Sequence, residues 1–336
     1  MPLERPPTPR FPDNLPPESP AGPPDEYGFP FDAMAAPRPR FEHRYWVHAL
    51  WLVATILTTT AAGGFHYYAF LSGFDGRDVR LSLELLWGAF WYSGTLLAIL
   101  GAHEMGHYVM CRVHQVDATL PYFLPAPLPL TGTVGAFIKI REPFRSKAAL
   151  FDIGVGGPIA GFVVLLPALF LGIAMSTMER LPATFDGLSL GEPLLFQWAA
   201  RIVWGAIPDG YSLNLHPMAF AAWFGLIATA LNLLPFGQLD GGHIAYAAVG
   251  RRATIVSLLT ILVAIALTAF SSSSWFVVTL MMLAMLFTIG ARHPRVPDED
   301  VPLDPVRVWI AIAAAIIFVL CFTPAPIEPY QLISNP

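Results

Sequence analysis

The residues with the clearest chemical potential are two histidines and a glutamate in the run His103-Glu104-Met105-Gly106-His107. Positions four apart lie on the same face of a helix, so His103 and His107 can direct imidazole nitrogens at one metal ion. Glu104 follows the first histidine and can take a proton from a metal-bound water without ligating the metal. The spacing therefore predicts a hydrolytic site with one Zn²⁺ per chain.

The same run lies inside an apolar segment, residues 85–111, in which His103, Glu104 and His107 are the only charged or histidine side chains. An ionised side chain at the centre of a bilayer costs about 2.5–3.5 kcal/mol on insertion scales. Packing of these polar residues against a neighbouring helix is the structural alternative. The cost of burying them favours a functional role.

The composition is that of a polytopic membrane protein. Of the 336 residues, 55% are hydrophobic and 13% are charged, whereas soluble domains have about 25% charged residues. The net charge of -5 gives no basis for nucleic-acid binding. Cys111 and Cys321 both lie in apolar runs, so any metal is expected to be held by histidine and carboxylate side chains.

The apolar runs predict an all-α fold with about seven transmembrane helices in a lipid bilayer. The expected helices are residues 45–74, 85–111, 153–178, 210–239, two within 253–291 separated at Ser271 to Ser274, and 308–326. Between the second and third helices, residues 113–149 are predicted to form a β-hairpin or re-entrant element at the mouth of the site. Residues 194–207 are amphipathic and are expected to lie at the membrane interface.

Three regions follow from this pattern. Residues 1–44 are expected to be a disordered cytoplasmic tail, because residues 1–40 hold 13 of the 33 prolines. Residues 45–291 form the expected membrane core with the metal site. Residues 292–336 are predicted to contain a linker, an additional transmembrane helix and a short tail.

Lysine and arginine in the short loops predict the orientation. One side of the expected membrane domain carries Arg38, Arg40, Arg44, Arg112, Lys139, Arg141, Arg145, Lys147, Arg251, Arg252, Arg292, Arg295 and Arg307, and the other carries Arg77, Arg80, Arg180 and Arg201. The amino terminus is therefore placed in the cytoplasm. The histidine pair then lies toward the cytoplasmic end of the second helix.

A third metal ligand is offered by Asp240, in the run Leu-Asn-Leu-Leu-Pro-Phe-Gly-Gln-Leu-Asp-Gly-Gly-His at residues 231–243. Catalytic zinc keeps three protein ligands and one open position. The predicted orientation places this run at the same membrane depth as the histidine pair, and Pro235 would let the helix unwind there. An ordinary interfacial aspartate is the alternative. His243 could be a hydrogen-bond partner of the ligands, a spare ligand or, as we favour, an interfacial histidine.

Two motifs in this order, H-E-M-G-H and N-L-L-P-F-G-Q-L-D-G-G, resemble the site-2 protease family of intramembrane zinc metalloproteases. The intervening G-T-V-G-A-F-I, F-D-I-G and G-G-P-I-A-G resemble the branch with chloroplast and bacterial members. The likeness spans residues 101–250. It implies zinc ligation by His103, His107 and Asp240, with Glu104 as general base and Asn232 near the scissile peptide bond.

The resemblance also implies a substrate class. Members cleave single-pass membrane proteins in or near their transmembrane segments, in regulated intramembrane proteolysis, and a bacterial cell membrane is the expected location. The loop at residues 179–216 is too short for the PDZ domain of several bacterial relatives. No oligomeric state is predicted.

A helical substrate must unwind before its peptide bonds can be attacked. Residues 134–140 are expected to hold the extended segment by strand addition, with Gly135 and Phe137 in contact with it. Two rival functions are a homologue that binds membrane proteins without cutting them and a transporter. A transporter would be expected to show internal repeats, and neither motif has a second copy.

Overall fold

The structure is a computed structural model that describes residues 44–80, 82–182, 187–288, 290 and 293–329. The Pro-rich tail predicted at residues 1–44 lies outside the described residues except for Arg44. Arg38, Arg40 and Arg292, which contributed to the predicted orientation, also lie outside them. The predicted division at residue 291 falls within another such segment.

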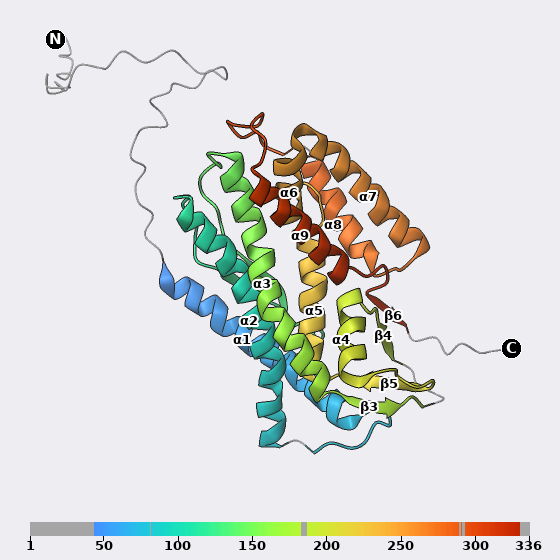
Figure 1. Ribbon diagram of the computed structural model, residues 1–336. Coiled ribbons are helices and arrows are strands. Elements are labelled where there is room, and N and C mark those ends of the chain that lie inside the picture. Colours follow the sequence, from blue (N-terminus) through green and yellow to red (C-terminus); the bar gives the residue numbers. More distant parts are fainter. Residues whose placement is uncertain (1–43, 81, 183–186, 289, 291–292, 330–336) are drawn as a thin grey trace, which may run out of the picture. The chain divides into compact units, whose positions relative to one another are not determined.

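The described residues are mostly helical (Figure 1). The α-helices are α1 (Tyr45–Ser72), α2 (Leu83–Val113), α3 (Lys147–Met175), α4 (Leu194–Trp204), α5 (Pro217–Asn232), α6 (Asp240–Val249), α7 (Ala253–Phe270), α8 (Trp275–Thr288) and α9 (Pro305–Cys321). The strands are β1 (Tyr122–Pro125), β2 (Thr133–Phe137), β3 (Thr177–Arg180), β4 (Leu188–Leu190), β5 (Tyr211–Asn214) and β6 (Ile327–Pro329). They form the antiparallel pairs β1–β2, β3–β5 and β4–β6. The mainly helical expectation holds, and the pair β1–β2 lies where a hairpin was one of the predicted forms. The pairs β3–β5 and β4–β6 were not predicted, because short extended stretches leave little signal in hydropathy.

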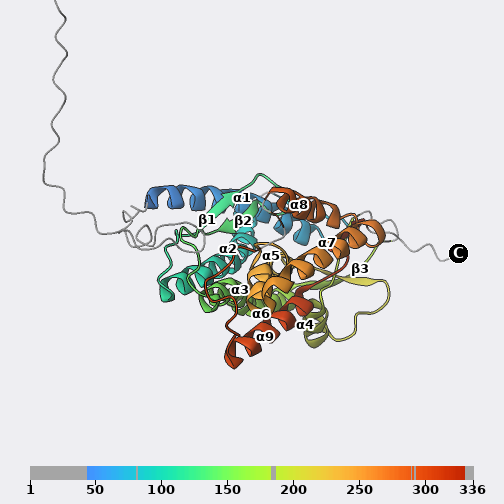
Figure 2. The ribbon, with the colours of Figure 1, turned by 90° about the horizontal axis from the view of Figure 1, so that it is seen from above.

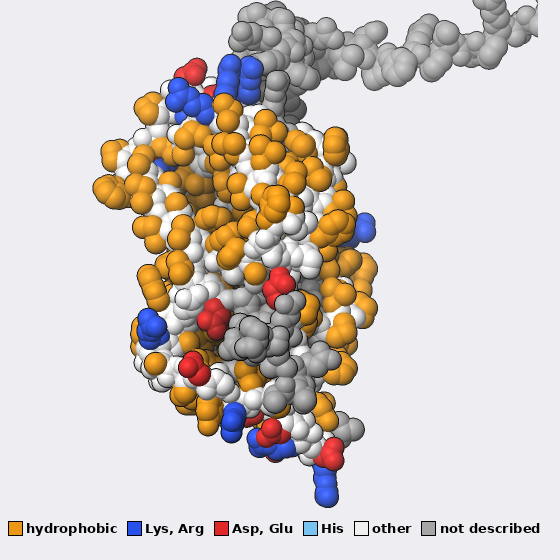
Figure 3. Space-filling view, turned by 90° about the vertical axis from the view of Figure 1, so that its right-hand side faces the viewer, with side chains coloured by type: hydrophobic (Ala, Val, Ile, Leu, Met, Phe, Trp, Pro, Cys, Tyr) orange, Lys and Arg blue, Asp and Glu red, His pale blue; other side chains and the backbone are white. Residues whose placement is uncertain are grey.

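Four stretches in the described residues are helical, long and apolar enough to cross a membrane: Tyr45–Ser72, Leu83–Val113, Lys147–Met175 and Asp240–Phe270. Helices α5, α8 and α9 are apolar but have only 16, 14 and 17 residues, and a perpendicular span needs about 20. The expectation of seven spans is therefore not confirmed. Figure 3 shows apolar side chains over much of one face, with most Lys and Arg toward its upper and lower ends.

Helix α5 is shorter than the expected helix at residues 210–239 because the chain leaves the helical path after Asn232. Pro235 lacks the amide proton that would continue the helix, and Gly237 adopts a φ of 53°, a value that favours glycine. The chain then turns into α6 at Asp240. The predicted unwinding before this aspartate is confirmed.

The helices α2, α3 and α5 pack against one another at the centre of the described part (Figure 1). Small residues allow α2 and α3 to approach closely: a Cβ added to Gly106 would lie 2.3 Å from the carbonyl oxygen of Gly156. The close contact predicted for the glycines at the start of the third helix is thus confirmed. Helix α5 contributes the fully buried Trp223 and Leu226 to the core.

The segment between α2 and α3 contains the β1–β2 hairpin, which lies between α1 and α2 in Figure 2. Tyr122 faces Phe137 across the hairpin, and Leu124 faces Gly135. The hairpin form of the prediction is therefore observed. Helix α3 begins at Lys147, before the expected residue 153, because the Ser146 hydroxyl accepts a hydrogen bond from the Ala149 amide and caps the helix.

Candidate metal centre

Three side chains from two distant parts of the chain meet beside α2. His103 and His107 stand on the same face of α2, and Asp240 is the first residue of α6. Their atoms are mutually close: Nε2 to Nε2 is 3.1 Å, and the Asp240 Oδ2 lies 3.2 Å from His103 Nε2 and 3.3 Å from His107 Nε2. This is the only His/Cys/Asp/Glu group of metal-binding geometry among the described residues.

These three separations fit the ligand shell of zinc. Zinc binds nitrogen and oxygen about 2.0–2.1 Å away in a tetrahedron, so neighbouring ligand atoms lie about 3.3 Å apart. The observed 3.1, 3.2 and 3.3 Å agree with that edge length. The residues present therefore fit a three-ligand zinc site with one open position.

The tautomer of His107 supports a cation at this point. Its Nδ1 lies 2.7 Å from the Ile153 carbonyl oxygen, and a carbonyl can only accept, so Nδ1 donates. In the neutral ring, Nε2 then carries a lone pair directed at the Asp240 carboxylate, which also only accepts. Such a convergence of lone pairs is stabilised by a metal ion between them, and ligating histidines commonly donate their second nitrogen in this way.

Glycines of α3 leave room for the two imidazoles. A Cβ on Gly157 would lie 2.1 Å from His107 Nε2, and a Cβ on Gly161 would lie 3.1 Å from His103 Cβ. Any larger residue at position 157 would therefore occupy the space of the ligand atom. The close packing of α3 on α2 is part of the construction of the site.

Glu104 is buried next to the three candidate ligands, with 7% of its surface exposed. The Ile138 backbone amide, directly after β2, faces its carboxylate. The glutamate is therefore held between the metal-binding helix and the end of the hairpin. A carboxylate here can accept a proton from water at the open metal position.

Asn232, the last residue of α5, also reaches this group. Its Nδ2 lies 3.4 Å from His103 Nε2. The side chain is half-buried, and its amide is a hydrogen-bond donor beside the candidate ligands. The structure thus brings five predicted residues together: His103, Glu104, His107, Asn232 and Asp240.

The comparison with known proteins agrees with this donor set. A family model described as Peptidase family M50 matches residues 91–270, which is more than half of the chain and includes all five residues. The chain belongs to peptidase family M50. Zn²⁺ is the metal named by its relatives, and the residues present fit it.

Three relatives of this M50 protein illustrate the likeness. "Probable zinc metalloprotease EGY2, chloroplastic" from Oryza sativa subsp. indica is 30% identical over 78% of this chain and 47% of its own length. The Arabidopsis thaliana protein of the same name is 27% identical over 75% and 45%. "Probable zinc metalloprotease EGY1, chloroplastic" from Arabidopsis thaliana is 28% identical over 56% and 35%. The chain thus spans less than half of these relatives, whose names give no support to a bacterial location.

Gly135 and Phe137 lie on β2 of this M50 protein, apart from the ligand group. Phe137 is 44% exposed, and its ring stacks on Tyr122 with centroids 5.4 Å apart. Gly135 has a φ of 118° and open space where a Cβ would lie. In the described residues β2 pairs only with β1, so its second edge has no strand partner. Contact with substrate at these positions stays a prediction.

His243 contacts another histidine, His293, which the sequence analysis did not consider as its partner. Its Nδ1 lies 2.7 Å from Nε2 of His293, and the His293 ring stacks on Tyr246. It is not among the three grouped metal donors. The spare-ligand alternative therefore receives no support from the structure.

Two contacts of the His107 ring in this M50 site were not predicted from the sequence. One is with the backbone carbonyl of Ile153, and the other is the close approach of Gly157. A carbonyl partner leaves no trace in residue types, because every residue has one. The glycine-rich start of α3 did signal a close helix contact, but not that the contact would be with the candidate metal ligand His107.

Proposed function

We propose that this M50 chain is a zinc-dependent endopeptidase that cleaves single-pass membrane proteins within or beside their membrane-spanning segment. The observation that carries the proposal is the meeting of His103, His107 and Asp240 at tetrahedral-edge distances. Helix α2, which bears two of these residues, is long and apolar enough to cross a membrane.

The chemistry that bound Zn²⁺ supplies is polarisation of the scissile carbonyl and a lowered pKa, about 7, for water. Glu104 takes a proton from that water and returns it to the leaving amine. The Ile138 amide, which faces the glutamate carboxylate, is proposed to orient it. Asn232 donates its amide to the substrate next to the scissile bond, where the developing negative charge favours a hydrogen-bond donor.

The substrate is proposed to bind as an extended strand. A membrane helix hides its carbonyls in its own hydrogen bonds, so a local unwound segment is needed. The free edge of β2 ends at Phe137, directly before Ile138, whose backbone amide faces the Glu104 carboxylate. A segment added to this edge through the region of Gly135 and Phe137 is delivered to the general base.

For the membrane orientation we propose a cytoplasmic amino terminus, on the asymmetry of lysine and arginine between the two sides. The candidate ligands lie near the carboxyl end of α2 and the start of α6. Water then reaches the site from the cytoplasmic side. We propose that this cleavage is a step of regulated intramembrane proteolysis.

The test is to reconstitute the protein in vesicles with a single-pass fusion substrate and to measure cleavage. Glu104→Gln is compared with the unchanged protein, and zinc is removed by a chelator and then restored. We expect loss of cleavage by a factor of about 100 or more for Glu104→Gln. Restored zinc should rescue the chelated protein but not the variant.

Two outcomes would overturn the proposal. Cleavage that persists in Glu104→Gln would show that another residue or a contaminating protease acts. Binding of the single-pass protein with no cleavage under any zinc condition would favour the non-cleaving alternative. Mass mapping of the product then places the cut relative to the spanning segment.

A further inference from the structure

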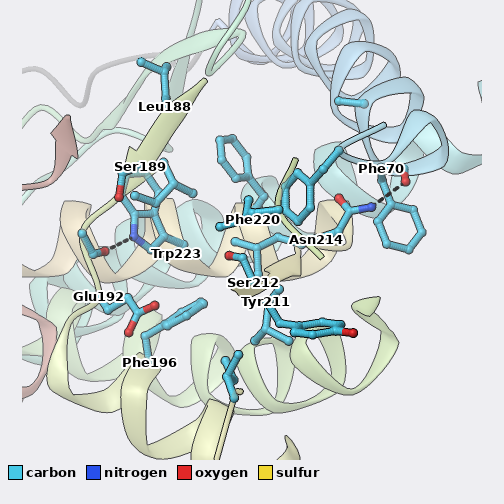
Figure 4. Close-up of a pocket in the computed structure, with 18 of the residues that line it drawn as sticks. Phe70, Leu188, Ser189, Glu192, Phe196, Tyr211, Ser212, Asn214, Phe220 and Trp223 are labelled. Atoms are coloured by element: carbon cyan, nitrogen blue, oxygen red, sulfur yellow. Dashed lines mark hydrogen bonds between the residues drawn. The ribbon is translucent and has the colours of Figure 1, made fainter. Parts of the chain in front are cut away.

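A cavity of about 710 Å³ lies beside the first half of α5 (Figure 4), whereas Asn232 at the metal centre ends this helix. We name it the β4–β5 cavity, because Leu188 to Leu190 and Tyr211 to Asn214 form two of its walls. Phe220 and Trp223, in the first half of α5, also line it. Trp223 and Asn232 are separated along the helix axis by about 13 Å at the usual rise per residue. None of the five grouped site residues lines this cavity.

The two strands that border the cavity each have an unused edge. In the described residues β5 pairs only with β3, and β4 pairs only with β6. An open strand edge presents unpaired amide and carbonyl groups to an extended polypeptide. Strand addition of this kind is a recurring mode of peptide recognition. The backbone at the cavity therefore suits an extended chain.

The acidic side chains that line the cavity indicate the charge of the ligand that it would bind. Glu192 and Asp209 are among its lining residues, and no lysine or arginine is. Both residues are exposed, and partial burial of the Glu192 carboxyl raises its pKa. In the described part of the chain neither takes part in an ion pair. Such a surface favours a cationic ligand and disfavours phosphate or carboxylate groups.

Aromatic rings provide the remaining surface. Glu192 and Phe196 lie on one side of the cavity, and Tyr211 and Ser212 lie on the other (Figure 4). Tyr211 is 43% exposed, so its ring is available to an incoming side chain. Aromatic faces beside carboxylates accommodate the aliphatic stem and the charged head of lysine or arginine.

Hydrogen bonds hold the walls in place before any ligand arrives. Trp223 Nε1 donates to the Gly191 carbonyl at 2.7 Å, which fixes the end of β4 on α5. Asn214 Nδ2 donates to the Phe70 carbonyl at 2.8 Å, which fixes β5 on the end of α1. These contacts are the dashed lines in Figure 4. A preformed concave site of this size is typical of binding pockets.

We propose that the β4–β5 cavity binds an extended polypeptide segment that carries lysine or arginine beside apolar residues. The inferred occupant is the segment that flanks the spanning helix of a substrate, and this identification rests on the proposed proteolytic function. Helix α5 runs from the cavity to Asn232, so a chain held here leads into the membrane toward the metal centre. The cavity thereby adds a second contact that selects substrates.

The experiment measures peptide binding to the full-length Glu104→Gln protein in detergent micelles by fluorescence anisotropy. The probe is a labelled ten-residue peptide in which valine and lysine alternate. One comparison peptide has glutamate at every lysine position, and another has alternate backbone amides methylated. We expect the lysine peptide to bind about 10-fold or more tightly than the glutamate peptide, with affinity falling as salt rises. Methylation should abolish binding, because it removes the strand hydrogen bonds.

Variants locate the binding. Glu192→Gln and Asp209→Asn should each weaken binding of the lysine peptide by about 3- to 10-fold. Glu142→Gln, whose carboxylate pairs with Arg145 outside the cavity, is the matched control and should leave the affinity unchanged.

Equal affinity for the lysine and glutamate peptides, or no effect of both cavity variants, would overturn the inference. Undiminished binding of the methylated peptide would exclude strand addition. Displacement of the peptide by phosphocholine would identify a lipid headgroup as the occupant and would also overturn it. Peptide binding is measured in Glu104→Gln, so a failure of the peptide to bind says nothing about cleavage. If the peptide binds but the unchanged protein cleaves no substrate, only the proposed function is contradicted.

Discussion

Arg307 and Asp152 form a two-point ion pair that joins α9 to α3, with Nη2 to Oδ2 at 2.6 Å and Nε to Oδ1 at 2.8 Å. His114, directly after α2, places its Nε2 2.8 Å from the same carboxylate. Asp152 precedes Ile153, whose carbonyl oxygen lies 2.7 Å from the His107 ring. A helix beyond the family match at residues 91–270 therefore braces the backbone that orients a candidate metal ligand.

Replacing Arg307 with methionine should loosen this brace. The change removes the guanidinium from the Asp152 carboxylate, which is 19% exposed, and leaves that carboxylate with His114 alone among the described residues. It also removes the ion pair of Arg307 with Asp304. We expect a loss of about 1–3 kcal/mol in the free energy of unfolding, between the values for exposed and buried pairs. Zinc affinity should also fall, because the Ile153 carbonyl is less firmly placed. Thermal unfolding in detergent and competition with a zinc-binding dye measure the two effects.

Arg251→Met is the control for Arg307→Met. Arg251 also pairs with a carboxylate, that of Glu299, but its side chain is 70% exposed. Removal of such a pair should cost less than about 1 kcal/mol and leave zinc affinity unchanged. If both variants lose zinc equally, the bracing role assigned to Arg307 is wrong.

Gly157→Ala should displace the His107 ring. The added Cβ would lie 2.1 Å from Nε2, closer than any non-bonded contact, so α3 or the imidazole must shift. We expect the purified variant to contain little zinc. Gly94→Ala is the matched control, because Gly94 has no atom within 4 Å of the added Cβ. Metal analysis of both proteins decides the matter, and a normal zinc content in Gly157→Ala would contradict the packing described for α3.

Asp240→Asn should weaken zinc binding. Loss of a hydrogen-bond partner of a ligand typically reduces metal affinity by about 10- to 100-fold, and loss of the anionic ligand itself should exceed that. Glu104→Gln should retain zinc, because Glu104 is assigned to proton transfer. Equilibrium competition against a chelator of known affinity separates the two variants. Unaltered affinity in Asp240→Asn would mean that Asp240 is not a ligand.

Asn232→Ala should slow cleavage while zinc stays bound. Its amide lies 3.4 Å from His103 Nε2 and is proposed to contact the substrate. Removal of one such donor slows comparable reactions by about 100-fold or more. Single-turnover cleavage of the fusion substrate, with zinc content measured in parallel, checks this. A parallel loss of zinc would instead assign Asn232 to support of the ligands.

The local patterns in the sequence were sufficient for much of the site. His103 and His107 share a helix face because the helical period places residues four apart together, and no tertiary contact is needed for that. Pro235 and Gly237 end α5 through their own backbone restrictions. Asp240 was matched to the histidines through the loop charges and through the family resemblance, and the structure brings its carboxylate within 3.2 Å of His103.

Hydropathy predicted where helices occur better than it predicted where each helix begins and ends. An apolar run at residues 210–239 contains no charged residue, so hydropathy alone extends a helix through it. In the structure α5 occupies only Pro217–Asn232, with β5 before it and a turn after it. Pairing of β5 with β3 depends on a partner earlier in the chain, which hydropathy does not record.

By itself, the sequence determined the pair of imidazoles, the adjacent glutamate and the apolar helix that carries them. Only the tertiary structure decided that Gly157 makes room for His107, that Arg307 pairs with Asp152 near the start of α3, and that separate segments enclose the β4–β5 cavity. The physical reason is the range of the interactions. Helix period and turn chemistry act over a few residues, whereas these contacts depend on how packed backbones bring distant residues together.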